Sequence, residues 1–128
     1  MQSNENNLNI NVIEVKKAAM VLRAINHKLR QQIVQLIHNA GRITVTEIYV
    51  KLRLEQSVAS QHLAILRKAG FLNTDREGKF IYYKVNYARF DEVDAFTKQL
   101  LHITNSNMAM SDASANWQAS IIPVNGSE

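Results

Sequence analysis

The fold is indicated by residues 44–70, which read TVTEIYVKLRLEQSVASQHLAILRKAG. Thr44 followed three residues later by Glu47 is a capping-box pattern, which predicts the start of a short helix. A three-residue turn at 53–55 follows, and apolar residues at helical spacing then predict a second helix over 56–68. Two helices joined by so short a turn predict a helix-turn-helix.

The predicted helix over 56–68 divides into two arcs when residues are placed at about 100° per step. The apolar arc contains Val58, Ala59, His62, Leu63, Ile65, Leu66 and Ala69. The opposite arc contains Gln56, Ser57, Ser60, Gln61, Ala64, Arg67 and Lys68. Amides and hydroxyls beside a small alanine suit a helix that reads base edges in the major groove. We therefore predict base contacts from Gln56, Ser57, Ser60 and Gln61.

Arg67 and Lys68 lie toward the far end of the same helix, where contact with DNA phosphates is more natural than base reading. Residues 71–75 and 80–85 have strand composition, and the tetrapeptide at 76–79 reads as a hairpin tip. Arg76 and Lys79 flank that tip. A basic hairpin after a helix-turn-helix predicts a wing that contacts the DNA backbone or enters the minor groove.

Helical periodicity extends on both sides of this unit. A helix is expected from Val12, a second one capped by Asn26 and stopped by Gly41, and a last one capped by Asn86. The predicted fold class is mainly α with a small β-hairpin, a winged helix-turn-helix in the order α-α-α-α-β-β-α. Residues 1–11 are expected to form a flexible arm, 12–105 the single domain, and 106–128 a disordered tail.

Basic residues concentrate in the middle of the chain. Between Lys16 and Arg89 there are 14 basic and four acidic residues, a charge of +10, whereas the whole chain carries +4. This asymmetry suits a polyanionic partner. No signal peptide and no apolar run of about 18 residues is visible, so we expect a soluble cytoplasmic protein that does not enter a membrane.

The motifs together resemble the ArsR/SmtB family of bacterial repressors. The resemblance spans about 12–105 and rests on residues 22–30, 43–63, 66–71 and 76–85. It implies a homodimer that occupies a palindromic double-stranded operator and responds to an effector, here unknown. It also implies dimerisation through the first and last helices, where the expected interface residues are Val12, Val15, Ala19, Phe96, Leu100 and Ile103.

The chain departs from the family pattern in three places. It has no cysteine, and the family's thiol metal site is replaced by Val-Thr-Glu-Ile at 45–48. Arg53 stands where the family usually has glycine, which predicts a left-handed backbone for a non-glycine residue. Glu55 stands where serine is usual and is a poorer N-cap. The thiol sensor of the family is therefore absent.

A second family metal site, on the last helix, has only the remnants Asp91 and His102. They are 11 residues apart, roughly 16 Å along one helix, so a partner subunit would have to bring them together. Neighbouring Arg89 and Asn105 are poor zinc ligands. We expect no cofactor and no metal, with His102 an ordinary surface or interface residue. Regulation by this remnant and metal-independent regulation both stay open.

Other function classes have less support. No nucleophile motif, phosphate-binding glycine loop or carboxylate–histidine set appears, so the sequence does not favour an enzyme. A winged helix used for protein interaction or dimerisation without DNA is the alternative, but it would need a non-basic or apolar reading arc. His62 lies on the apolar arc, so we expect it to be a hydrogen-bonded core histidine rather than a DNA contact.

Overall fold

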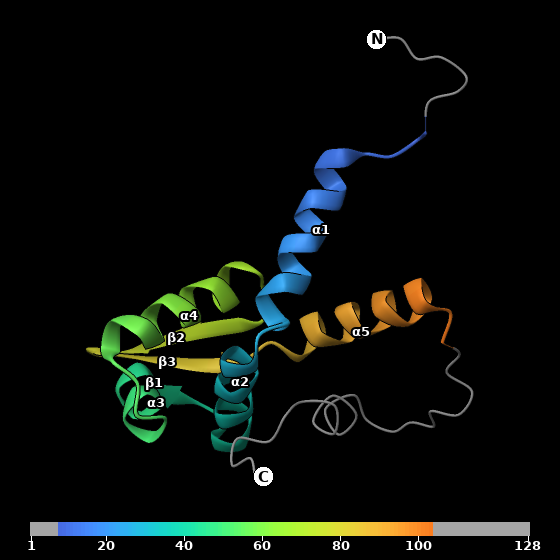
Figure 1. The fold of residues 1–128 in the computed structure, drawn as a ribbon. Coiled ribbons are helices and arrows are strands. Elements are labelled where there is room, and N and C mark those ends of the chain that lie inside the picture. Colours follow the sequence, from blue (N-terminus) through green and yellow to red (C-terminus); the bar gives the residue numbers. More distant parts are fainter. Residues whose placement is uncertain (1–7, 104–128) are drawn as a thin grey trace.

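The structure, a computed structural model, describes residues 8–103 (Figure 1). In that range the chain forms α1 (Val12–Ile25), α2 (Lys28–Ala40), β1 (Ile43–Thr44), α3 (Val45–Lys51), α4 (Gln56–Lys68), β2 (Leu72–Glu77), β3 (Phe80–Val85) and α5 (Tyr87–Leu101). The predicted order of four helices, a hairpin and a last helix is confirmed. The predicted tail at 106–128 and most of the arm at 1–11 lie outside the described residues.

The core lies where α2, α3 and α4 meet the sheet. Its fully buried side chains include Ile33 and Ile37 of α2, Ile48 of α3, and Leu63 and Leu66 of α4. Phe71, between α4 and β2, is also fully buried, and its ring centroid lies 4.8 Å from that of Phe90 in α5. These apolar side chains of α2, α3 and α4 are thus removed from water, which fixes how the three helices sit on the sheet.

The sheet has three antiparallel strands in the order β1-β3-β2. Leu72 pairs with Val85 and Glu77 with Phe80, so the hairpin closes over Gly78 and Lys79. Gly78 has a φ of +63°, as expected for a tight hairpin turn. The two-residue strand β1 was not predicted, because a strand that short leaves no periodicity in the sequence.

Helix caps agree only in part with the expectations. The capping box is present: Glu47 N–H donates to the Thr44 hydroxyl, and Thr44 N–H donates to the Glu47 carboxylate. The expected cap of α2 by Asn26 is wrong, because Asn26 ends α1 and the His27 ring accepts from Arg30 N–H instead. Asn86 occupies the N-cap position of α5, but its side chain makes no capping hydrogen bond.

Arg53 has a φ of +56°, so the predicted left-handed residue is confirmed. A left-handed backbone at a non-glycine residue costs roughly 1–2 kcal/mol of stability. A glycine variant avoids this cost but loses part of the gain, because glycine makes the unfolded chain more flexible. We predict that Arg53→Gly raises the free energy of unfolding by about 0.5–1 kcal/mol in urea titrations. Arg53→Ala removes the same side chain but keeps Cβ, and should give no such gain. If the glycine variant were less stable than the alanine variant, the backbone at Arg53 would not be strained.

Candidate nucleic-acid interface

The two faces of α4 lie in different environments. Ala59, Leu63 and Leu66 are fully buried, whereas the side chains expected to read DNA are exposed: Gln56, Ser57, Ser60, Gln61, Arg67 and Lys68. The division into two arcs is therefore confirmed, with one correction. Ile65, placed on the apolar arc, is 40% exposed because it faces a groove beside α1 rather than the core.

The turn before α4 holds the two helices of the motif together. Leu54 N–H donates to the carbonyl of Tyr49 at 2.9 Å, which closes the turn onto the end of α3. Glu55 takes the N-cap position of α4 and makes no side-chain hydrogen bond, as expected of a poorer cap. The first turn of α4 thus presents Gln56 and Ser57 to solvent.

The hairpin carries exposed cations at its tip and is braced at one side by a residue that the sequence did not single out. Lys79 is an exposed residue of the two-residue turn, and Arg76 is exposed near the end of β2. The guanidinium of Arg42 lies 3.8 Å from the ring centroid of Tyr82, and it pairs with Glu77 at 3.3 Å. Arg42 therefore links the segment before β1 to both strands of the hairpin.

A polar hollow lies where α4 meets the hairpin. Its walls include Arg67 at the end of α4, Asn73 and Thr74 of β2, and Lys84 of β3. Lys84 pairs with Asp75 at 2.9 Å, whereas Arg67 makes no ion pair within residues 8–103. The strand cation Lys84 thus lies in the same hollow as the helix cation Arg67. No sequence pattern predicts that these two cations lie together, because side chains on two strands and a helix meet only in the folded chain.

His62 holds α4 to the helices before it. Arg30 Nε donates to Nδ1 of His62 at 3.1 Å, and the same guanidinium donates to the carbonyls of Ala24 at 3.2 Å and Arg23 at 3.3 Å. The His27 ring lies 5.0 Å from the His62 ring. The prediction of an inward, hydrogen-bonded histidine is confirmed, although the side chain is half-buried rather than in the core.

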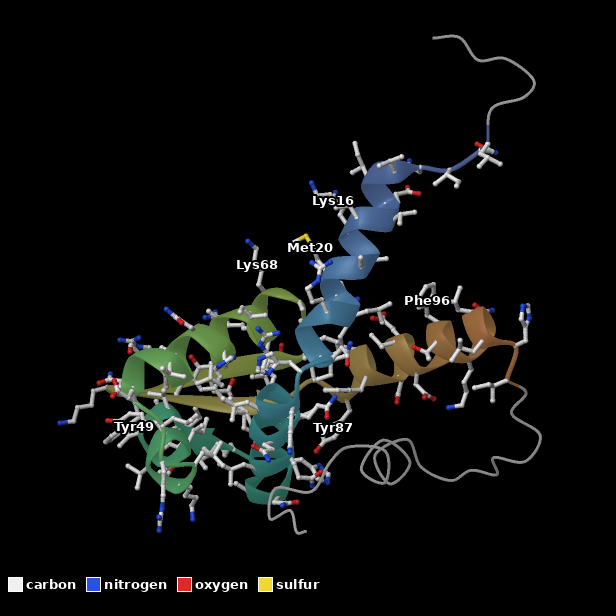
Figure 2. The ribbon with its side chains drawn as sticks, viewed as in Figure 1. Lys16, Met20, Tyr49, Lys68, Tyr87 and Phe96 are labelled. Carbon is white, nitrogen blue, oxygen red and sulfur yellow. The ribbon has the colours of Figure 1, made fainter. Side chains whose placement is uncertain are left out.

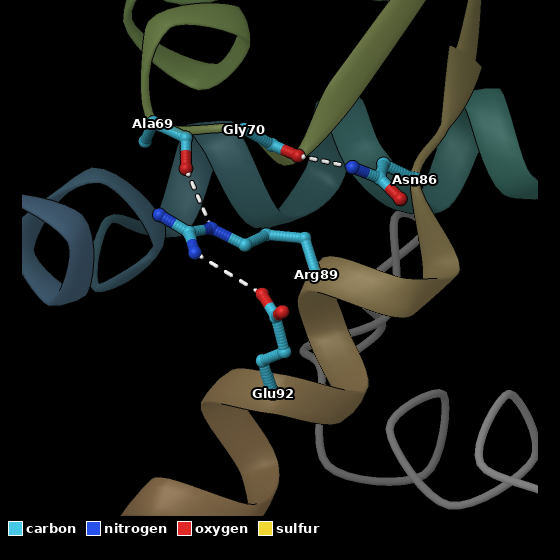
Figure 3. Close-up of polar contacts among 5 residues, drawn as sticks. All are labelled: Ala69, Gly70, Asn86, Arg89 and Glu92. Atoms are coloured by element: carbon cyan, nitrogen blue, oxygen red, sulfur yellow. Dashed lines mark hydrogen bonds and ion pairs between the residues drawn. The ribbon is translucent and has the colours of Figure 1, made fainter.

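The other end of α4 is held by α5 (Figure 3). Arg89 Nε donates to the carbonyl of Ala69 at 2.9 Å, and its Nη1 donates to the Glu92 carboxylate at 3.1 Å. Asn86 Nδ2 donates to the carbonyl of Gly70 at 2.9 Å. A cation at the C-terminal end of a helix is favoured by the helix dipole. Arg89 and Asn86 therefore connect α4 to α5, a role that the sequence analysis missed.

The remnant of the family metal site is not assembled within one chain. Asp91 and His102 are both exposed, and His102 is the C-cap of α5, with a φ of +60°, rather than a residue within the helix. Among residues 8–103, no three His, Asp or Glu side chains come close enough together to hold a metal ion. No helix in that same range has the length and apolar composition needed to cross a membrane.

The short helix α3, the turn, the helix α4 with a polar outer face, and the basic hairpin define a winged helix-turn-helix, a class of DNA-binding fold. Comparison with known proteins agrees. The family described as "Bacterial regulatory protein, arsR family" matches residues 27–74. The transcriptional activator HlyU of Vibrio cholerae is 36% identical over 86 residues, covering 67% of this chain and 75% of HlyU.

The transcriptional repressor PagR of Bacillus anthracis is 31% identical over 84 residues, which cover 66% of this chain and 84% of PagR. Its crystal structure superposes with a TM-score of 0.54 at 29% identity, over 68% of this chain and 99% of that one. The chain therefore belongs to the ArsR family and is a DNA-binding transcriptional regulator.

Burial lowers the pKa of His62 below its ordinary value, and electrostatic interactions with Arg30 and then His27 lower it further. Since the folded state disfavours the proton, the stabilisation by neutral His62 is complete above the unfolded pKa, about 6.5. It is lost as the pH falls below that value toward the folded-state pKa. We predict that His62→Asn, whose amide oxygen can still accept from Arg30, makes the free energy of unfolding less dependent on pH below 6.5.

The measurement is urea unfolding at a series of pH values between 7.5 and 5. The difference in slope cannot exceed that of one proton, about 1.4 kcal/mol per pH unit. Ser60→Asn, at an exposed position of the same helix that carries no titratable group, is the matched control and should keep the pH dependence of the parent chain. If the free energy of unfolding depended on pH in the same way in the parent and in His62→Asn, protonation of His62 would not be coupled to folding.

Proposed function

We propose that the chain is a repressor that binds a palindromic operator as a homodimer, with α4 in the major groove and the β2–β3 hairpin on the backbone or in the minor groove. The observation that carries this proposal is the exposed polar arc on a helix whose opposite face is anchored by three fully buried side chains, Ala59, Leu63 and Leu66. A helix fixed in this way presents the same side chains to every operator, which is what base reading needs.

The exposed side chains divide by chemistry. Gln56, Ser57, Ser60 and Gln61 supply the amides and hydroxyls proposed to read bases. Arg67, Lys68, Arg76 and Lys79 are proposed to contact phosphates, which position the protein without reading sequence. Lys84 borders the same hollow as Arg67 and adds positive charge there, although its pairing with Asp75 weakens its contribution. Release from the operator is proposed not to use a thiol, because the chain has no cysteine.

Dimerisation is proposed to occur through α1 and α5, which project from the body of the molecule (Figure 1). Both helices carry exposed apolar side chains: Val12 is 72% exposed and Leu100 59%. Val15, Phe96 and Ile103 are exposed as well, and Ala19 is half-exposed. So many apolar side chains on two adjoining helices indicate a protein interface, and a twofold dimer would place two copies of α4 on two half-sites.

Variants of the two proposed contact types should behave differently on DNA. We predict that Gln61→Ala reduces the preference for the operator over unrelated DNA by about 1–3 kcal/mol, because a bidentate base contact is lost. Lys79→Ala should weaken binding to all sequences alike and reduce the slope of log K against log salt by about 0.9. Fluorescence anisotropy with the DNA upstream of the chain's own gene, at several salt concentrations, measures both quantities.

Lys28→Ala is the matched control for charge, since Lys28 is an exposed lysine at the start of α2 and outside the proposed contact set. It should leave the overall affinity, the salt slope and the sequence preference unchanged. Normal operator preference in Gln61→Ala would contradict the placement of α4 in the groove.

The proposed dimer predicts a coupling between assembly and DNA affinity. Phe96→Glu and Leu100→Glu place charges on the exposed apolar face of α5, and we expect each variant to be monomeric. Operator affinity should then fall by more than tenfold, because a monomer contacts one half-site and one half-site carries little binding energy. Val50→Glu, at an exposed valine of α3, is the control and should stay dimeric. Analytical ultracentrifugation gives the oligomeric state; dimeric α5 variants would refute this interface.

A further inference from the structure

A groove of about 370 Å³ lies between α1 and α4, and of the residues that line it only Lys68 belongs to the proposed DNA contacts. Its floor is apolar and comes from Met20, Val21 and Ala24 of α1 and from Ile65 of α4. Figure 2 shows Met20 and Lys68 on the same side of the molecule, where the end of α4 passes α1. The volume is within the range of small-molecule sites, about 300–1,000 Å³.

The charges around this groove have one sign. Lys17 of α1 and Lys68 of α4 both border it, from opposite helices, and no Asp or Glu is among the residues that line it. Neither lysine makes an ion pair with any other residue in the range 8–103. An apolar floor between two unpaired cations is complementary to a small molecule with an apolar body and one anionic end.

We propose that this groove binds a small amphipathic carboxylate, with its hydrocarbon part on Met20 and Ile65 and its carboxylate beside Lys17 and Lys68. Burial of apolar surface on Ile65 and Met20 would supply most of the affinity. The lysines would select for negative charge, since a hydrogen bond between a cation and a carboxylate is stronger than a neutral one.

The position of the groove gives this site a regulatory consequence, which rests on the proposed function. One wall belongs to α1, proposed to dimerise, and the other to α4, proposed to read DNA. A ligand that fits only one spacing of these two helices shifts the chain toward that spacing, and so changes operator affinity. Ile65, the most exposed side chain on the apolar arc, is the residue of α4 through which the ligand would act.

The test uses the full chain without DNA and sodium decanoate as the probe, below its micelle-forming concentration. Isothermal calorimetry should show saturable binding at one site per chain. Decanol and decyltrimethylammonium, which share the tail but not the negative charge, should bind at least tenfold more weakly. Backbone amide shifts in NMR spectra should change along the facing parts of α1 and α4.

Matched variants separate the groove from unspecific binding. Lys68→Gln and Ile65→Asn should each weaken decanoate binding about tenfold, the effect expected from losing one charge-assisted bond or one apolar wall. Lys51→Gln and Val50→Asn change an exposed lysine and an exposed valine on α3, away from the groove, and should bind as the parent does. Circular dichroism checks that every variant is folded.

Several results would overturn the proposal. One is decanoate binding that does not saturate in calorimetry, and another is decanol binding equally well. The others are NMR shifts confined to the face between α1 and α5, and a groove that the partner subunit covers in the dimer. Binding of inorganic phosphate but not decanoate would also overturn it and would return Lys68 to the phosphate contacts. Operator anisotropy with and without decanoate is a separate experiment: absence of specific operator binding in both conditions would refute the proposed function, while calorimetry would still decide the ligand site.

Discussion

The burial of one face of α4 is the constraint on which the rest of the structure depends. Ala59, Leu63 and Leu66 have no exposed surface, and truncating a buried leucine to alanine costs about 2–5 kcal/mol. Rotation of α4 about its axis would expose these side chains and bury the amides on the opposite arc. The helix is therefore held in one orientation. Contacts from Arg30 to His62 and from Arg89 to Ala69 fix it further, near its middle and at its end.

The placement of unpaired cations explains how a chain with a modest net charge can bind a polyanion. The ion pairs of the described residues lie at the surface, where each contributes about 0–1 kcal/mol, so they do little for the fold. The cations at the outer end of α4 and at the hairpin tip, Arg67, Lys68, Arg76 and Lys79, have no such partners in the described part of the chain. Their charge is available for phosphates, while Arg42 is used to brace the hairpin.

Local signals in the sequence predicted the elements well. The capping box at Thr44, the turn at Arg53 and the glycine of the hairpin each fix a backbone geometry through nearby residues, and each is present in the structure. Long-range contacts were not predictable in this way. Asn86 looked like a cap but donates to Gly70, and the contact from Arg89 to Ala69 joins residues 20 positions apart. Ile65 followed the helical period of the core, yet the end of α4 passes beside α1, where no core forms over it.

Methylation interference on the operator shows whether α4 occupies the major groove, because N7 methylation of guanine blocks that groove alone. If two copies of α4 read two half-sites, interference should fall in two clusters about one helical turn, 10–10.5 base pairs, apart or at a multiple of that spacing. The clusters should be related by the twofold symmetry of the operator. Interference spread evenly along the DNA, or confined to adenine N3 in the minor groove, would contradict the placement of α4.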